Sequence, residues 1–149
     1  MDPRPILLVD DTPDDVALTL RALRRHNFGH EVHVMRDGVE ALDYLRGTGP
    51  FAGRDTRLQP ALILLDLKLP RLSGLEVLKR LREDPKLRQL RVVVLTSSRQ
   101  EEDILASYTH GACSYVRKPI DFNAFLKVVG QLGDYWLSLN ESAPVPQPV

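Results

Sequence analysis

The sequence predicts a single α/β domain, in which a five-stranded parallel sheet is covered by helices on both faces. Short apolar runs alternate along the chain with segments of helical spacing, five times in succession, and this alternation is typical of doubly wound parallel sheets. The chain has 149 residues, of which 43% are hydrophobic. That is the length of one ordinary domain, with enough apolar side chains to fill one core.

Three of the runs are apolar on both faces and too short for helices, so they indicate buried parallel strands: Ile6–Val9, Ala61–Leu65 and Val92–Leu95. The segment Glu31–Arg36 alternates, with Val32 and Val34 on one face, as expected of a strand nearer an edge of the sheet. Ser114–Arg117 is a weaker candidate for the fifth strand.

Helical spacing fills the intervals, and residues suited to cap a helix open most of these segments. Thr12 precedes Pro13, a residue favoured at the first helical position, and Asp15 stands three residues after Thr12. The other expected helices cover Gly38–Leu45, Ser73 or Gly74 to Glu83, a segment from the capping-box pair Ser98 and Glu101 toward Thr109, and a last helix capped by Asp121.

Two segments stand outside this alternation. Gly47–Pro60 is a connection longer than most, and the sequence leaves open whether it is ordered. Residues 140–149 contain three prolines and little to bury, so we expect a disordered tail after a domain over residues 1–139.

Composition excludes several classes of protein. Lys and Arg total 20, as do Asp and Glu, so the chain lacks the basic excess of nucleic-acid-binding proteins. The apolar runs are too short to cross a membrane, and Met1–Pro5 lacks the regions of a signal peptide. The single cysteine, Cys113, permits no internal disulfide. We therefore expect a cytoplasmic protein with no nucleic-acid or membrane partner.

Polar side chains follow four of the predicted strands. Asp10 and Asp11 follow the first, Asp66 the third, Thr96 the fourth and Lys118 the fifth. Because open parallel sheets place their sites at the carboxyl ends of the strands, these side chains are expected at one edge. Each alone has a plainer explanation, such as a turn residue, a helix cap or a solvated loop residue. Their joint occurrence is what indicates a site.

Three carboxylates in one small site repel each other, so protons or a cation must offset their charge. All-oxygen ligands favour a hard cation, and Mg²⁺ suits a site with few carboxylates and a phosphate ligand. A carboxylate can also act as a nucleophile toward phosphorus, which gives an aspartyl phosphate. The metal and Lys118 would then stabilise charge on the transferred oxygens, and Thr96 could donate a hydrogen bond to one of them.

The order of these motifs resembles the receiver domain of two-component response regulators, over about Ile6 to Trp136. The resemblance rests on four motifs: Leu8-Val9-Asp10-Asp11, then Leu64-Leu65-Asp66-Leu67-Lys68-Leu69-Pro70 with Gly74 following, then Leu95-Thr96-Ser97, and Tyr115-Val116-Arg117-Lys118-Pro119. It implies the flavodoxin-like receiver fold and a signalling protein that catalyses only its own phosphotransfer and dephosphorylation, rather than an enzyme with turnover.

The resemblance also implies a role for each site residue. Asp66 accepts a phosphoryl group from a histidine kinase, and Thr96 and Lys118 contact that group. Asp11 and Asp66 ligate Mg²⁺ (or Mn²⁺) directly, Asp10 assists through water, and the backbone carbonyl of Lys68 supplies another ligand. In the same family, Tyr115 is the aromatic residue that swings inward when Thr96 engages the phosphate, and the Lys118–Pro119 bond is usually cis.

Within the family, the chain is most similar to single-domain regulators partnered with phytochrome-type histidine kinases. The long segment Gly47–Pro60, the stretch Lys118–Phe122 and a long final helix without an output domain suggest this. Without such a domain the signal must leave by association. We therefore expect a homodimer through the fourth helix, fifth strand and last helix, where Ile104, Leu105 and Tyr108 supply apolar surface.

Other functions are less well supported by the sequence. A Mg²⁺-dependent phosphohydrolase with an aspartyl nucleophile would need a second acid two residues after Asp66, and that position is Lys68. Shorter polar residues such as Asn are frequent there in receivers, so Lys68 could alter the lifetime of the aspartyl phosphate. A degenerate receiver that acts only as an interaction module would lack some of the acids, the Thr or the Lys. A nucleotide-binding protein would carry a glycine-rich phosphate motif after a strand, and this chain has none.

Overall fold

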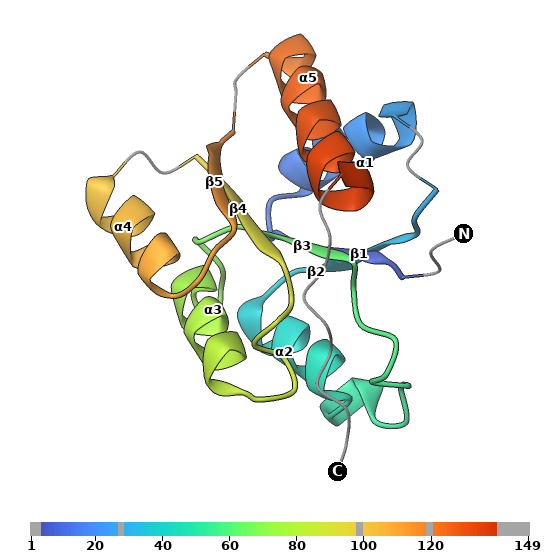
Figure 1. Ribbon diagram of the computed structural model, residues 1–149, viewed down its shortest axis with the longest axis vertical. Helices are drawn as coiled ribbons and strands as arrows, with labels where there is room; N and C mark the ends of the chain where they lie inside the picture. Colours follow the sequence, from blue (N-terminus) through green and yellow to red (C-terminus); the bar gives the residue numbers. More distant parts are fainter. Residues whose placement is uncertain (1–3, 27–28, 98–99, 119–120, 140–149) are drawn as a thin grey trace.

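The computed structural model describes residues 4–26, 29–97, 100–118 and 121–139. Its centre is a parallel five-stranded sheet in the order β2-β1-β3-β4-β5 (Figure 1). The strands are β1 (Ile6–Val9), β2 (Val32–Met35), β3 (Leu62–Leu65), β4 (Val92–Thr96) and β5 (Ser114–Arg117). This confirms the predicted α/β class, and all five strands fall where the sequence places them.

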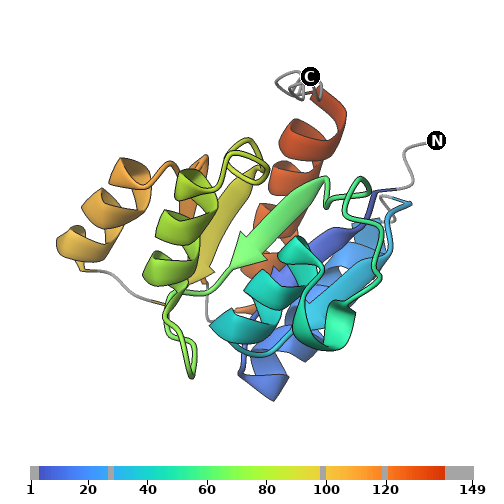
Figure 2. The same ribbon diagram turned by 90° about the horizontal axis from the view of Figure 1, so that it is seen from below.

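Five α-helices alternate with the strands. They are α1 (Pro13–His26), α2 (Gly38–Arg46), α3 (Gly74–Glu83), α4 (Glu101–Thr109) and α5 (Phe122–Gly133). A 3₁₀ turn, Gly49–Phe51, follows α2, and the chain continues beyond α5 in a π-helical segment, Asp134–Leu139. The helices cover both faces of the sheet, as Figure 2 shows.

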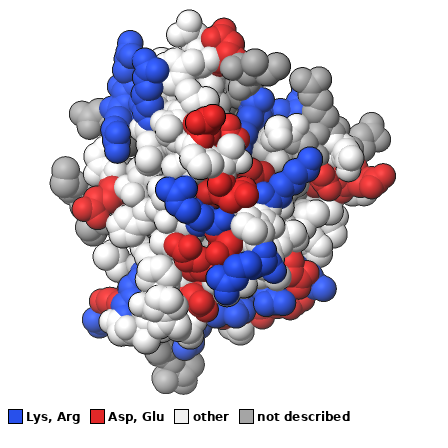
Figure 3. Space-filling model, turned by 180° about the vertical axis from the view of Figure 1, so that it is seen from behind, with Lys and Arg blue, Asp and Glu red and all other residues white. Residues whose placement is uncertain are grey.

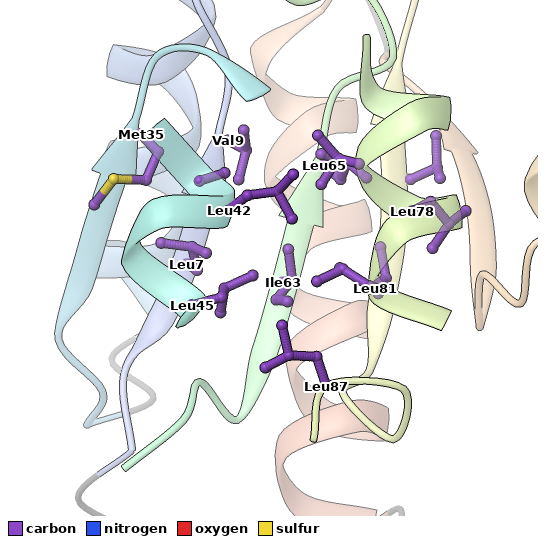
Figure 4. Close-up of a cluster of buried hydrophobic side chains, with 14 of the residues drawn as sticks. Leu7, Val9, Met35, Leu42, Leu45, Ile63, Leu65, Leu78, Leu81 and Leu87 are labelled. Carbon is purple, nitrogen blue, oxygen red and sulfur yellow. The ribbon is translucent and has the colours of Figure 1, made fainter. Parts of the chain in front are cut away.

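Alternation of side chains along each central strand supplies two hydrophobic cores, one on each face of the sheet. Leu7 and Val9 of β1 face a cluster that includes side chains of α2 and α3 (Figure 4), whereas Ile6 and Leu8 face a cluster with side chains of α1 and α5. Because both faces of β1, β3 and β4 are buried, these strands have no polar alternation.

Side-chain caps begin three of the helices. The carboxylate of Asp37 accepts a hydrogen bond from the Glu40 amide at 2.7 Å, before α2. Ser73 and Asp121 cap α3 and α5 in the same way, and the sequence predicts the second of these caps. The capping box of α4 is not tested, because Ser98 lies outside the described residues. The residue directly before α4 is Gln100, whose side chain makes no capping hydrogen bond.

The long connection after α2 is ordered, and Arg54 holds it. The Arg54 guanidinium lies 4.1 Å from the ring centroid of the buried Tyr44 and donates from Nε to the Tyr44 carbonyl at 2.6 Å. It also donates to the Leu58 carbonyl and to Oε1 of Gln59. Arg54 thereby connects this segment to the end of α2 and to the residues that lead into β3.

Within the described ranges, no helix combines the length and apolarity that crossing a membrane requires. Residues 140–149, expected as a disordered tail, lie outside those ranges.

Candidate functional site at the carboxyl edge of the sheet

Three carboxylates meet where β1 and β3 end. The two strands are neighbours with Val9 opposite Leu65, so Asp10 and Asp66, which follow them, stand side by side. Asp11 comes next in the chain, and one carboxylate oxygen from each of the three acids lies within 4.8 Å of the others. Asp10 and Asp66 are buried, whereas Asp11 is exposed. The cluster therefore opens to solvent on the side of Asp11.

Lys118 supplies the positive charge at this cluster. Its Nζ donates to Oδ2 of Asp10 at 2.7 Å and to Oδ2 of Asp66 at 3.0 Å, and its side chain is only 9% exposed. Burial by itself would lower the pKa of Lys118, but the hydrogen bonds to carboxylates outweigh it and the pKa lies above its ordinary value. The ammonium is therefore charged at neutral pH.

Burial raises the pKa of Asp10 above its ordinary value, although the hydrogen bonds from Lys118 and from the Thr12 amide oppose this shift. The negative charge of nearby Asp66 adds to the increase. Three carboxylates share one ammonium in this cluster, and a divalent cation would offset the remaining negative charge.

Both carboxylate oxygens of Asp66 have donors aimed at them. Oδ1 accepts from the hydroxyl of Thr96 at 2.9 Å and from the backbone amide of Lys68 at 3.3 Å, while Oδ2 accepts from Lys118. The Thr96 and Lys118 ends are themselves joined, because the Lys118 amide donates to the Thr96 carbonyl at 2.9 Å. β4 and β5 therefore present one hydroxyl and one ammonium to Asp66 as a unit.

Gly74 explains how the chain after Asp66 returns so closely. Its amide donates to the Leu67 carbonyl at 2.8 Å, and a Cβ at this position would lie 2.1 Å from the Asp66 carbonyl oxygen. Because that is well inside any van der Waals contact, only glycine fits there. The position of the Gly after the Asp66 motif is thus a packing requirement of the site.

The structure brings together Asp10, Asp11, Asp66, Thr96 and Lys118, the residues that the strand pattern alone had placed at one edge. The Lys68 side chain is exposed, and its contact with Asp66 is made by its backbone amide.

Two further expectations from the sequence concern Tyr115 and the peptide bond after Lys118. The half-buried Tyr115 packs against the core cluster on the α2 and α3 face, and its amide donates to the Tyr108 hydroxyl at 3.2 Å. Pro119 lies outside the described residues, and with it the expected cis bond after Lys118.

Sequence reasoning missed one member of the site, Asp15. Its Oδ2 accepts from Lys118 Nζ at 2.9 Å. The sequence suggested only a role in starting the helix. The available signal was its place in the first turn of the helix that directly follows Asp10 and Asp11, since that turn lies over the same edge of the sheet.

The surface carries no large area of one charge on the face seen in Figure 3, where acidic and basic side chains are interspersed. This face offers no basic stripe of the kind that tracks a nucleic-acid backbone.

Comparison with known proteins identifies relatives over almost the whole chain. Residues 6–130 match the family described as the response regulator receiver domain. A probable methanogenesis regulatory protein, FilR2 of Methanothrix harundinacea, is 39% identical over 144 residues, which cover 95% of this chain and 88% of FilR2. The response regulator Rcp1 of Synechocystis is 36% identical over 135 residues, covering 91% and 90%.

Solved structures agree with this relationship. The Mn²⁺-bound form of Rcp1 superposes with a TM-score of 0.86 at 34% identity, covering 95% of this chain and 100% of that one. The phosphorylated cyanobacterial phytochrome response regulator RcpA gives 0.87 at 37% identity, covering 95% and 99%. The bacteriophytochrome response regulator AtBRR gives 0.76 at 50% identity, covering 95% and 100%.

Proposed function

The chain belongs to the family of response regulator receiver domains, and we propose that it signals by accepting a phosphoryl group from a histidine kinase on Asp66. Membership makes it a two-component signalling protein, and relatives of similar length include one solved in a phosphorylated form. The geometry of this site supports Asp66 as the acceptor.

The observation that carries the proposal is the surrounding of the Asp66 carboxylate. It is buried beside two further acids, with the Thr96 hydroxyl on one oxygen and the Lys118 ammonium on the other. A carboxylate with donors already in place can become an acyl phosphate whose new oxygens take over the same donors. No other acid among the described residues has this set of partners in the structure.

The donor set of the site also fits a hard divalent cation. Asp10, Asp11 and Asp66 would hold Mg²⁺, or Mn²⁺ as in the Rcp1 structure, with the Lys68 carbonyl as a further ligand. The ion would supply positive charge that offsets the carboxylates and the phosphoryl oxygens.

In the transfer itself, a carboxylate oxygen of Asp66 attacks the phosphorus of a phosphohistidine. The new O–P bond forms as the P–N bond breaks, and the imidazole leaves with the bonding electron pair, neutral when its other nitrogen carries a proton. Thr96 and Lys118 donate to the oxygens of the transferred group and stabilise its charge. Lys68 stands where an aspartyl phosphohydrolase would need a general acid–base, so we propose a phosphoacceptor rather than a turnover enzyme.

Phosphorylation would switch a protein-binding surface formed by α4, β5 and α5. Thr96 ends β4, and the next helix along the chain, α4, carries two exposed apolar side chains, Leu105 at 70% and Tyr108 at 50% exposure. We propose that Tyr115 of β5 changes position when Thr96 turns to the phosphoryl group, and that this face forms a homodimer. Sedimentation that shows a monomer at all workable concentrations, with and without phosphorylation, would exclude the dimer.

The kinase partner is proposed to be of the phytochrome type. RcpA and AtBRR, which are named as phytochrome response regulators, align with nearly the whole chain at 37% and 50% identity. Phosphotransfer from a phytochrome-type kinase that is faster than transfer from unrelated histidine kinases would support this partner.

Intact mass after incubation with acetyl phosphate tests the chemistry directly. We expect one added phosphoryl group that requires Mg²⁺ and is absent from Asp66→Asn. An adduct that persists in Asp66→Asn would refute the assignment of the acceptor. If wild-type protein gives no adduct and also fails to bind beryllofluoride, the chain is a degenerate receiver and the proposal is wrong.

A further inference from the structure

A fourth carboxylate, outside the candidate metal set, contacts Lys118. Asp15 lies in the first turn of α1, and its Oδ2 is 2.9 Å from Lys118 Nζ. The Lys118 ammonium therefore donates to three acids, Asp10, Asp15 and Asp66, at distances between 2.7 and 3.0 Å. An ammonium has three N–H donors, so these contacts use its whole donor capacity.

We propose that Asp15 is a positioning residue that holds the Lys118 ammonium over Asp66 and thereby raises the rate at which Asp66 takes up a phosphoryl group. The proposal rests on the proposed function of Asp66 as phosphoacceptor. Among the described residues, no hydrogen bond or ion pair joins Asp15 to Asp66, so Asp15 acts on Asp66 only through Lys118.

The reason lies in what each partner of Lys118 does when the site is loaded. Asp10 and Asp66 belong to the cluster suited to a divalent cation, and a cation there would offset their charge and repel the ammonium. Asp15 is not part of that cluster, so its charge stays available to Lys118. The contact with Asp15 would therefore keep the ammonium in the site, and an N–H of Lys118 released by Asp10 or Asp66 could face the incoming phosphoryl oxygens.

The neighbouring acid, Asp14, provides a matched control. Asp14 and Asp15 both lie in the first turn of α1, where a negative charge favours the helix dipole. Asp14 is exposed, and none of the contacts of Lys118 involves it. Replacing either acid by Asn removes one charge from the same helix end, but only replacement of Asp15 changes the partners of Lys118.

The test compares rates of phosphorylation by acetyl phosphate at saturating Mg²⁺. We expect Asp15→Ala to lower the rate constant by about three- to tenfold, as loss of one orienting charge-assisted contact would. Asp14→Ala, the matched substitution, should stay near wild type. Asp15→Glu should recover part of the rate, because the 35% exposed side chain at this position has room for one more methylene.

A double-mutant cycle separates positioning from a general effect on folding or charge. In a Lys118→Ala background, adding Asp15→Ala should change the rate by less than about 1.5-fold, since the residue through which Asp15 acts is gone. The ¹⁵N and ¹H shifts of the Lys118 ammonium should move in Asp15→Asn and stay in place in Asp14→Asn.

The outcomes distinguish this inference from the proposed function. A wild-type protein without any adduct would refute the function and the inference together. A wild-type adduct with an unchanged or faster rate in Asp15→Ala would refute the inference alone. So would an equal loss of rate in the Lys118→Ala background, because Asp15 would then act by a route other than Lys118.

Discussion

Replacing Lys118 by Met tests how strongly the acidic site depends on one ammonium. The substitution keeps the length and apolar character of the stem but removes the charge that lies 2.7–3.0 Å from Asp10, Asp15 and Asp66. Removing one partner of a buried ion pair costs about 3–5 kcal/mol. The Asp15 side chain is 35% exposed and is screened by water, so we expect a loss of about 2–3 kcal/mol at pH 7 without metal.

Urea denaturation measures this loss. With an m value of about 2 kcal/mol/M, the midpoint should fall by about 1–1.5 M. The control is Lys79→Met, which removes one positive charge from an exposed position of α3 and should leave the midpoint nearly unchanged.

Two further measurements show whether uncompensated carboxylates are the cause. The pKa of Asp10 is already raised in the folded protein, so the folded state binds this proton more readily than the unfolded chain does. Protonation of Asp10 therefore favours the folded state, and the variant should recover part of its loss as the pH falls from about 7 through the raised pKa of Asp10. Saturating Mg²⁺ should also narrow the difference from wild type, because the cation replaces the missing charge. A loss that depends on neither pH nor Mg²⁺ would refute the electrostatic explanation.

Three other substitutions test separate parts of the structure. Gly74→Ala should destabilise the fold by about 2–4 kcal/mol and slow phosphorylation, since its Cβ would lie 2.1 Å from the Asp66 carbonyl oxygen; thermal unfolding and intact mass check both effects. Arg54→Ala should make residues 47–60 more susceptible to limited proteolysis, whereas Arg57→Ala, which removes an exposed pair with Asp55, should not. Lys68→Ala should change Mg²⁺ affinity by less than about threefold in calorimetry, because the proposed ligand at this position is the backbone carbonyl and the charged side chain is exposed to solvent.

The sequence predicted the sheet well because its three central strands are apolar on both faces. A buried strand in a parallel sheet leaves a short continuous apolar run, and Ile6–Val9 matches the observed β1 without any shift. β5 gave a weaker signal because it is an edge strand whose residues are half-buried or exposed. The meeting of the residues that follow the strands was also predictable, since the topology of a parallel sheet brings the carboxyl ends of its strands to one edge.

The contacts that the sequence could not supply are those between side chains far apart in the chain. Asp15 and Lys118 are separated by 103 residues, and their pairing depends on where α1 lies over the edge of the sheet. Arg54 likewise orders its loop by lying on the ring of Tyr44, a contact that composition does not reveal. A stretch that contains Gly and Pro can be mobile or fixed, and here the contacts of the Arg54 side chain fix its conformation.

The arrangement of donors around Asp66 indicates why phosphorylation should act on one side of the molecule. Asp10 and Asp66 follow β1 and β3, strands that are buried along their whole length and anchored in both cores. Of the two donors proposed for the phosphoryl group, Thr96 ends β4, which is as buried as β1 and β3, whereas Lys118 follows β5, which is only partly buried. Moving the acids or β4 would disturb two cores, whereas moving Lys118 disturbs an edge strand and the helix beside it. The less costly response is therefore on the β5 side, next to α4, where Leu105 and Tyr108 are already exposed.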